Sequence, residues 1–297
     1  MVGFVTSLIV LLLVLYIGAL IVVTYVSIHP PRVPLWLSPA MLGFPEERVG
    51  LESGGVELDG WWSECGSGEL AIICCHGYLM NRCELMPMMI RLADLEASWL
   101  FFDFRSHGKS GGRTCTMGKL EALDVAAAAK WVRERQPNAK IVLFGSSMGA
   151  AASAIALGED PSLADALVLD GAFSSMDEAG RGWWDFIGGR TLAVVLAPTV
   201  FIGRLMLRFN PAKVVIAEYL NRIQHKPALF LAGEDDPIVP IASMERNAEA
   251  AGSDTVIVRF ENCGHGEARF KQPSEYTEAI RKFVLESVMG SGDGSRP

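Results

Sequence analysis

The sequence Ile141-Val-Leu-Phe-Gly145-Ser146-Ser147-Met148-Gly149-Ala-Ala-Ala152 joins a short apolar run directly to an alanine-rich segment. A short apolar run that ends at glycine is typical of a buried parallel strand, and alanine favours helix. Gly-x-Ser-x-Gly at such a junction predicts a nucleophile elbow, whose tight turn needs the flanking glycines and exposes the serine. The pattern alone is weak evidence because glycine and serine are common, but the flanking strand and helix make it strong. We therefore interpret Ser147 as a nucleophile.

The residue after the nucleophile has a predicted role as well. Ser147 would stand at the N-terminus of a helix, where the dipole favours developing negative charge. The backbone N–H of Met148 would then stabilise the oxyanion that forms when a carbonyl is attacked. A serine hydroxyl is a poor nucleophile until a base removes its proton, so the site also needs a histidine.

The chain has five histidines, so the base can be sought by elimination. Four of them lie in a proline-rich stretch, in polar segments or at a strand end: His29, His76, His107 and His225. His265 follows the last predicted strand and precedes the last predicted helix, the place where proteins with a nucleophile elbow present their base, in the chain order serine, acid, histidine. We expect His265 to be the base.

An acid must orient and charge the imidazole. The segment Gly233-Glu-Asp235-Asp236-Pro-Ile-Val-Pro240 follows a predicted strand and offers three carboxylates in a row. Asp236 is the first candidate and Asp235 the second. Asp170, which ends the preceding predicted strand, is the third.

Strand and helix patterns alternate through most of the chain. Strands are expected at 47–52, 56–62, 70–75, 98–103, 140–145, 166–170, 227–232 and 255–260, and helices at 84–95, 119–135, 147–157, 241–250 and 273–288. The first two strands are expected to form a hairpin. The alternation predicts an α/β fold with a mostly parallel sheet and helices on both faces.

One long segment interrupts this alternation. Residues 174–226 lie between two predicted strands and contain Trp183, Trp184, Phe186 and the apolar stretch 191–203. A structureless loop of that length is improbable, so we expect a helical insertion that forms a lid over the site. The stretch 191–203 is too short to span a bilayer.

The N-terminal residues 1–28 carry no charged side chain, and such a length of apolar helix can cross a bilayer. A cleaved signal peptide would have a basic start and a shorter apolar core, so an uncleaved single-pass transmembrane anchor is favoured.

Five prolines predict an extended linker at 29–46. Arg32, the one basic residue near the anchor, places the catalytic domain in the cytosol. The catalytic domain is expected at 47–289 and a disordered tail at 290–297.

The net charge and the cysteine spacing argue against two classes of ligand, nucleic acids and metal ions. The net charge of −8 argues against nucleic acid, which requires a basic face. The six cysteines lack CxxC or His/Cys ligand spacing, so no metal site is predicted and free, mostly buried thiols are expected. Cys74 and Cys75 are adjacent in a predicted strand, so their side chains should point to opposite faces.

Several motifs together resemble those of the α/β-hydrolase superfamily, and more closely its membrane-anchored serine-aminopeptidase-like branch: His76-Gly77-Tyr78, Asp103-Phe-Arg105-Ser-His-Gly-Lys-Ser-Gly-Gly112, the Ser147 elbow, Gly233…Asp236…Pro240 and Gly264-His265. The resemblance covers about residues 47–289. It implies that the acid is the third residue after the glycine, which selects Asp236, and that the N–H of Tyr78 is the second oxyanion donor. It implies structural roles for Asp103, Arg105 and His107. Ser106 departs from the glycine common there, which bears on loop geometry.

The resemblance also narrows the reaction. Haloalkane dehalogenases and epoxide hydrolases of this fold have aspartate at the elbow, so Ser147 favours acyl transfer to water, without metal or organic cofactor. The apolar insertion favours a carboxylic ester with an acyl or lipid-like group. An acyl-protein thioesterase or a peptidase is the alternative, and Asp177 or Glu178 could bind a substrate amine. A non-catalytic hydrolase-fold binding protein is the other alternative, but such proteins typically lack the serine or the histidine.

Overall fold

The computed structural model describes residues 1–290, which form an eight-stranded sheet in the order β1-β2-β4-β3-β5-β6-β7-β8. The strands are β1 Glu47–Ser53, β2 Val56–Ser63, β3 Leu70–Cys75, β4 Ser98–Phe102, β5 Lys140–Ser146, β6 Ala166–Asp170, β7 Ala228–Gly233 and β8 Thr255–Phe260. β1 and β2 form the expected antiparallel hairpin, β2 is antiparallel to β4, and the strands from β3 to β8 run parallel. The predicted α/β-hydrolase fold is confirmed. The disordered tail expected at 290–297 lies outside the described residues, apart from Gly290.

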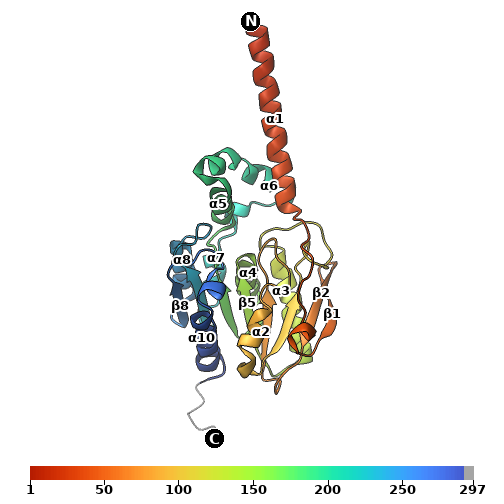
Figure 1. Cartoon of the computed structure of the whole chain (residues 1–297), viewed down its shortest axis with the longest axis vertical. Coiled ribbons are helices and arrows are strands. Elements are labelled where there is room, and N and C mark those ends of the chain that lie inside the picture. Colours follow the sequence, from red (N-terminus) through yellow and green to blue (C-terminus); the bar gives the residue numbers. More distant parts are fainter. Residues whose placement is uncertain (291–297) are drawn as a thin grey trace.

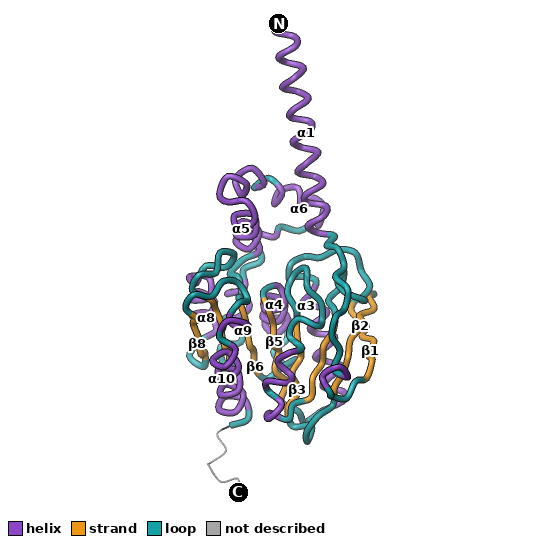
Figure 2. Tube along the Cα trace, in the orientation of Figure 1, coloured by secondary structure: helices purple, strands orange, loops and turns teal. Residues whose placement is uncertain are grey.

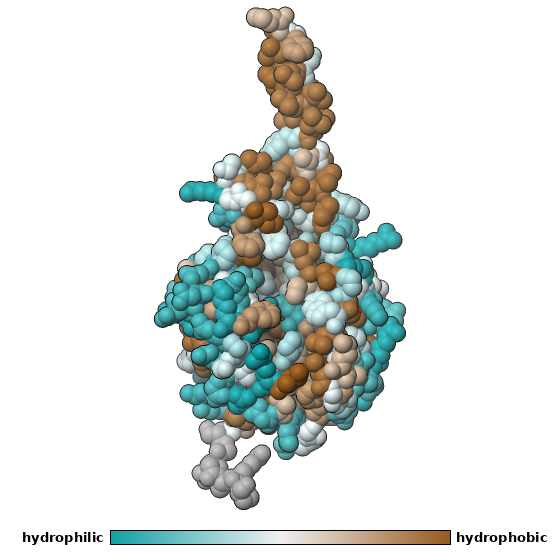
Figure 3. Space-filling view, in the orientation of Figure 1, coloured by the Kyte–Doolittle hydropathy of each residue, from teal (hydrophilic) through white to brown (hydrophobic). Residues whose placement is uncertain are grey.

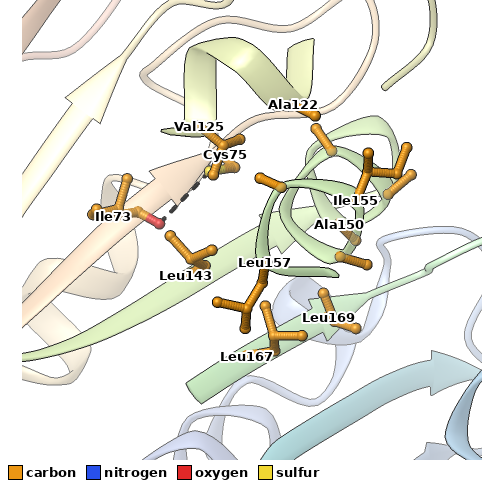
Figure 4. Packing of buried hydrophobic residues seen from close by; sticks show 14 of the residues in the cluster. Ile73, Cys75, Ala122, Val125, Leu143, Ala150, Ile155, Leu157, Leu167 and Leu169 are labelled. Atoms are coloured by element: carbon orange, nitrogen blue, oxygen red, sulfur yellow. Dashed lines mark hydrogen bonds between the residues drawn. The ribbon is translucent and has the colours of Figure 1, made fainter. Parts of the chain in front are cut away.

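Helices cover both faces of the sheet (Figures 1 and 2). One face packs against α3 Glu121–Arg135, α4 Met148–Glu159, α7 Ile216–Leu220 and α8 Ile241–Ala251, and the other against α2 Pro87–Arg91 and α10 Pro273–Phe283. Alternate strand residues enter the two cores, and Cys75 and Cys74 point to opposite faces as expected. In Figure 4, Leu167 and Leu169 of β6 point toward the alanine-rich α4, whose small side chains allow close approach. All six cysteines are free, and five are buried.

The helix expected at 84–95 is wrong at its N-terminal end. The α-helix α2 begins only at Pro87, and a 3₁₀ turn, η2 Ala93–Leu95, follows it. Proline lacks an N–H and is favoured in the first helical turn, so it marks the helix start. The Glu84 side chain turns into the interior instead, where it accepts a 2.6 Å hydrogen bond from the N–H of Gly77. Near the C-terminus, α9 Ala268–Lys271 precedes α10, which continues as a π-helical turn, η4 Val284–Val288.

The N-terminal helix α1, Val2–Ile28, projects away from the sheet (Figure 1). Its most apolar 18-residue window has a mean hydropathy of 2.9 and is 6% buried, so α1 is long and apolar enough to cross a membrane. The one regular element in the segment 29–46 is a 3₁₀ turn, η1 Ala40–Leu42, and the segment is bound to the domain. The Arg32 guanidinium donates to the carbonyls of Gly108 and Gly112, and the N–H of Cys115 donates to the carbonyl of Ile28.

The segment 174–226, which we call the insertion, is helical as predicted. It contains α5 Met176–Leu196, α6 Thr199–Leu207, the 3₁₀ turn η3 Pro211–Lys213 and α7. The Ser175 side chain caps α5 by accepting from the N–H of Glu178. α5 breaks at Gly188 and Gly189, whose backbone angles are not helical, and the chain bends by 76° between α5 and α6. These two helices lie above the sheet and beside the lower half of α1 (Figures 1 and 2).

Candidate active site

Ser147 lies in the sharp turn between β5 and α4. Its φ of 51° and ψ of −110° are strained for a residue with a side chain, as is typical of functional turns. A Cβ at Gly145 would lie 2.5 Å from the Cα of Ala150, and one at Gly149 would lie 2.0 Å from the carbonyl oxygen of Cys75. Both flanking positions therefore require glycine, and the turn has the strand–turn–helix geometry predicted for an elbow.

His265 and Asp236 form a hydrogen-bonded pair at the same edge of the sheet. Nδ1 of His265 lies 2.7 Å from Oδ2 of Asp236. Oδ1 of Asp236 accepts from the N–H groups of Ile238 and Val239, each at 2.8 Å, and these bonds fix the carboxylate. A Cβ at Gly171 would lie 2.9 Å from Cε1 of His265, so glycine there leaves room for the ring.

The surroundings of His265 determine its proton affinity. Burial by itself lowers its pKa, but the hydrogen bond and charge of Asp236, together with the charge of Asp170, outweigh burial and the net pKa is raised. The Asp236 side chain is only 3% exposed, so water screens this interaction weakly. With Nδ1–H donated to a carboxylate, Nε2 is the unprotonated nitrogen of the neutral ring.

The structure separates the three candidate acids. Asp235 is exposed and its side chain is not bonded to His265. Asp170 is buried and accepts from the Tyr276 hydroxyl at 2.8 Å, and Arg269 lies 3.9 Å from it. Asp236 is the candidate that contacts the histidine.

The two predicted oxyanion donors both lie beside the elbow. Met148 is the first residue of α4, so its N–H has no intrahelical acceptor. Tyr78 follows Gly77 in the loop after β3. Within residues 1–290 neither N–H is paired with a backbone acceptor.

Ser147 and His265 line one cavity of about 420 Å³, a volume in the range of small-molecule sites. Its walls are mostly apolar. The insertion contributes Met176, Trp183, Trp184, Val200 and Leu207, and Tyr78 makes an edge-to-face contact with Trp183. The last turns of α1 contribute Thr24, Ser27 and Ile28, which sequence reasoning did not predict. The Tyr78 hydroxyl donates to the carbonyl of Ser27 at 2.8 Å and links this wall to the loop that carries the oxyanion donor.

A buried charge cluster below the elbow was also missed. Glu84 Oε1 accepts from Arg269 at 2.6 Å and from the Ser146 hydroxyl at 3.0 Å, while Oε2 accepts from the N–H of Gly77. Burial raises the pKa of Glu84, but the Arg269 charge and the Gly77 N–H outweigh burial, and the net pKa is lowered. The carboxylate therefore holds the Gly77–Tyr78 loop in place. Partners so distant in sequence leave no local signal.

The remaining motif residues have structural contacts. Burial, aided by His107, lowers the pKa of His76 to about 4, and Nε2 of this neutral ring accepts from the N–H of Phe104. Asp103 pairs with Arg82 at 2.7 Å and Arg105 with Asp124 at 2.6 Å, all buried. Ser106, the departure from the glycine expected by resemblance, has a φ of +67°, in the left-handed region that glycine adopts most easily.

The fold and the elbow define the class of α/β hydrolases, and the model of a family described as alpha/beta hydrolase fold matches residues 71–199. The chain belongs to this family, and membership supports hydrolase activity. An uncharacterized protein of Mycobacterium tuberculosis is 31% identical over 241 residues, which cover 79% of this chain and 77% of the relative. Protein bem46 of Schizosaccharomyces pombe is 24% identical over 260 residues, 84% of this chain and 80% of its own. The esterase Pf2001 of Pyrococcus furiosus matches with a TM-score of 0.74 at 26% identity, covering 88% of this chain and 98% of that one.

Proposed function

We propose that the protein is a serine hydrolase that cleaves carboxylic esters with an apolar acyl group, using Ser147, His265 and Asp236 as a triad. The observation that carries the proposal is the shared cavity. The strained elbow serine and the Asp236-paired histidine open on the same apolar space. A nucleophile, a base oriented by an acid and two available amides are the parts that acyl transfer requires.

In the proposed reaction, Ser147 Oγ attacks the ester carbonyl as Nε2 of His265 takes its proton. Asp236 stabilises the imidazolium through Nδ1–H, and the amides of Tyr78 and Met148 bind the oxyanion. The imidazolium then gives its proton to the leaving alcohol, which leaves an acyl-enzyme. Water, activated by the same histidine, hydrolyses the acyl-enzyme and restores the serine.

The lining of the cavity favours an acyl group over a peptide. Two carboxylates among the described residues line the cavity, and each is already paired with an arginine: Glu84 with Arg269, and Asp177 with Arg181 at 2.8 Å. Glu178, the other amine-binding candidate, pairs with Arg246 at 2.8 Å. A peptidase would leave a carboxylate for the substrate amine. A thioester needs no such group, so an acyl-protein thioesterase remains the alternative.

We further propose that α1 is retained as a single-pass membrane anchor and that the hydrolase domain faces the cytosol. Loss of α1 as a signal peptide would remove Thr24, Ser27 and Ile28 from the cavity wall. The insertion would then act as the lid, with Trp183 and Trp184 facing the substrate. Arg32, next to α1, supports the cytosolic orientation.

A panel of esters of increasing acyl length tests the substrate class. Each methylene buried in the cavity should contribute about 0.8 kcal/mol, or about fourfold in kcat/KM, until the cavity is full. Trp184→Ser should flatten this climb and leave acetyl esters almost unaffected. Trp36→Ser, in the linker and away from the cavity, is the matched control. A flat wild-type profile would remove the acyl-pocket proposal, and faster thioester turnover would favour the alternative.

A further inference from the structure

We propose that the tip of the insertion enters the hydrocarbon layer of the membrane beside α1, so that the cavity takes its substrate directly from the lipid leaflet. The tip comprises the end of α5, the bend and α6, residues 186–207. The identity of the substrate rests on the proposed function. The membrane contact of the tip rests on geometry alone.

Contacts between α1 and the insertion fix the position of the tip along the axis of α1. The Tyr16 hydroxyl donates to the carbonyl of Val195 at 2.6 Å, close to the bend between α5 and α6. Further down, Leu20, Thr24 and Ile28 form the buried stripe of α1, at the i, i+4, i+8 spacing of one helix face. A Cβ at Gly203 of α6 would lie 3.7 Å from Cγ2 of Thr24, so the helices approach closely there.

The length of α1 then decides where the tip lies. A hydrocarbon core of about 30 Å takes about 20 helical residues, so even a core placed at the N-terminal end of α1 would extend to about residue 22. Tyr16 would lie about 9 Å inside that boundary, at 1.5 Å per residue. Side chains on a helix lean toward its N-terminus, so the Val195 carbonyl lies at that depth or deeper. A tilted α1 would need more residues to cross, which puts Tyr16 deeper still.

The outer surface of the tip fits this position. Seven large apolar side chains of the tip are exposed: Phe186, Ile187, Val194, Val195, Phe201, Leu205 and Met206. Figure 3 shows brown surface on α1 and again on the adjoining α5–α6 region. Between Phe186 and Phe209 the charged residues are three arginines and no carboxylate. Arginine can keep its head group at the lipid phosphates while its stem lies in apolar surroundings.

The same helices also form the cavity wall. α6 exposes Phe201 and Leu205 on its outer face but turns Val200, Gly203 and Leu207 toward the cavity. Thr24 and Ile28 of α1 line the cavity next to them. α1 and α6 therefore form one side of the cavity wall, and in this position they contact lipid on their other side. An acyl chain could pass between them without crossing water.

Fluorescent labels of the full-length protein in phosphatidylcholine liposomes test the depth of the tip. In a Cys65→Ser background the other native cysteines are buried, so an environment-sensitive label would react at Val194→Cys or Phe201→Cys. The control is Ser253→Cys, an exposed position just before β8 and therefore at the edge of the sheet opposite the site. Labels at 194 and 201 should be quenched by lipid-borne nitroxide and shielded from aqueous iodide, with the reverse pattern at 253. Iodide quenching at 194 and 201 as strong as at 253 would overturn the proposal.

A second measurement tests delivery from the leaflet. The double variant Val194→Glu, Phe201→Glu places two charges on the outer face of the tip and alters no residue that lines the cavity. Turnover of a long-chain ester dissolved in liposomes should fall by about tenfold or more, because charged side chains are expelled from hydrocarbon. Turnover of a water-soluble short-chain ester should stay within about twofold. Equal rates of variant and wild type on the liposome substrate would contradict leaflet delivery. If wild type hydrolyses neither ester, the proposed function fails, while the depth result stands by itself.

Discussion

The substitution Glu84→Gln tests whether the buried cluster below the elbow positions the oxyanion loop. One oxygen of Glu84 accepts from Gly77 and the other from Arg269 and Ser146. A glutamine has a single acceptor oxygen, so in either orientation its NH₂ group would face a donor. Breaking a buried ion pair by removing one partner costs about 3–5 kcal/mol, and Asp170, 3.9 Å from Arg269, compensates only in part.

We therefore expect a loss of about 3 kcal/mol in the free energy of unfolding, or about 10 °C in Tm for a domain of this size. The released Gly77–Tyr78 loop would misplace one oxyanion donor, so kcat should fall by up to about 10²–10³ while KM changes little. Denaturant unfolding and ester kinetics, measured below the Tm of the variant, check the two effects separately. Glu278→Gln, which breaks an exposed ion pair with Arg281, is the control and should cost less than about 1 kcal/mol. An unchanged kcat in a folded Glu84→Gln protein would refute the positioning role.

Three further predictions concern the triad and α1. Asp236→Asn should lower kcat by about 10⁴. Asp170→Asn should keep most of the kcat but lower the Tm, because Asp170 bonds Tyr276 and not His265. If Asp170→Asn lowers kcat more than Asp236→Asn does, the acid is misassigned. Because the pKa of His265 is raised, this base stays protonated to a higher pH than an ordinary histidine does. The acidic limb of the pH profile of kcat/KM should therefore have its midpoint above about pH 6.5. A midpoint below that pH in the wild type would contradict the pairing with Asp236. Deletion of residues 1–28 should release the protein from membranes. It should also lower activity on long-chain esters more than on acetyl esters, because it removes part of the cavity wall. A truncated protein with the wild-type chain-length profile would show that α1 does not shape the site.

The parts of the fold that depend on local pattern were predictable. Each predicted strand is present, because buried strands such as β3 are short apolar runs between glycines and turns. The elbow was predictable because Gly145 and Gly149 have no room for a side chain, so the sequence must show both glycines. The pairing of His265 with Asp236 followed from chain order and from the resemblance to known hydrolases.

The parts that depend on long-range contact were not predictable. The Glu84–Arg269 pair joins residues 185 positions apart, and neither stands in a recognisable motif. The apolar pattern of α1 predicts a membrane helix equally well whether or not its end lines a cavity. The role of Thr24 and Ile28 emerges only when the insertion packs against them. The predicted start of α2 at residue 84 was wrong. The charged and apolar residues at 84–86 fit a helical pattern, but Pro87 is the first residue of the helix, so α2 begins three residues later than predicted.

The nucleophilic role of Ser147 is tested most directly by covalent labelling. The full-length protein is treated with a fluorophosphonate probe, digested, and the modified residue is located by mass spectrometry. We expect one adduct, on Ser147, which is lost in Ser147→Ala, while the neighbouring Ser146→Ala variant still carries it. Turnover by Ser147→Ala should fall to the level that the oxyanion amides alone provide, which is about 10³–10⁴-fold above the rate of the uncatalysed reaction in water. An adduct on another serine, or ester turnover by Ser147→Ala at the wild-type rate, would contradict the nucleophilic role of Ser147.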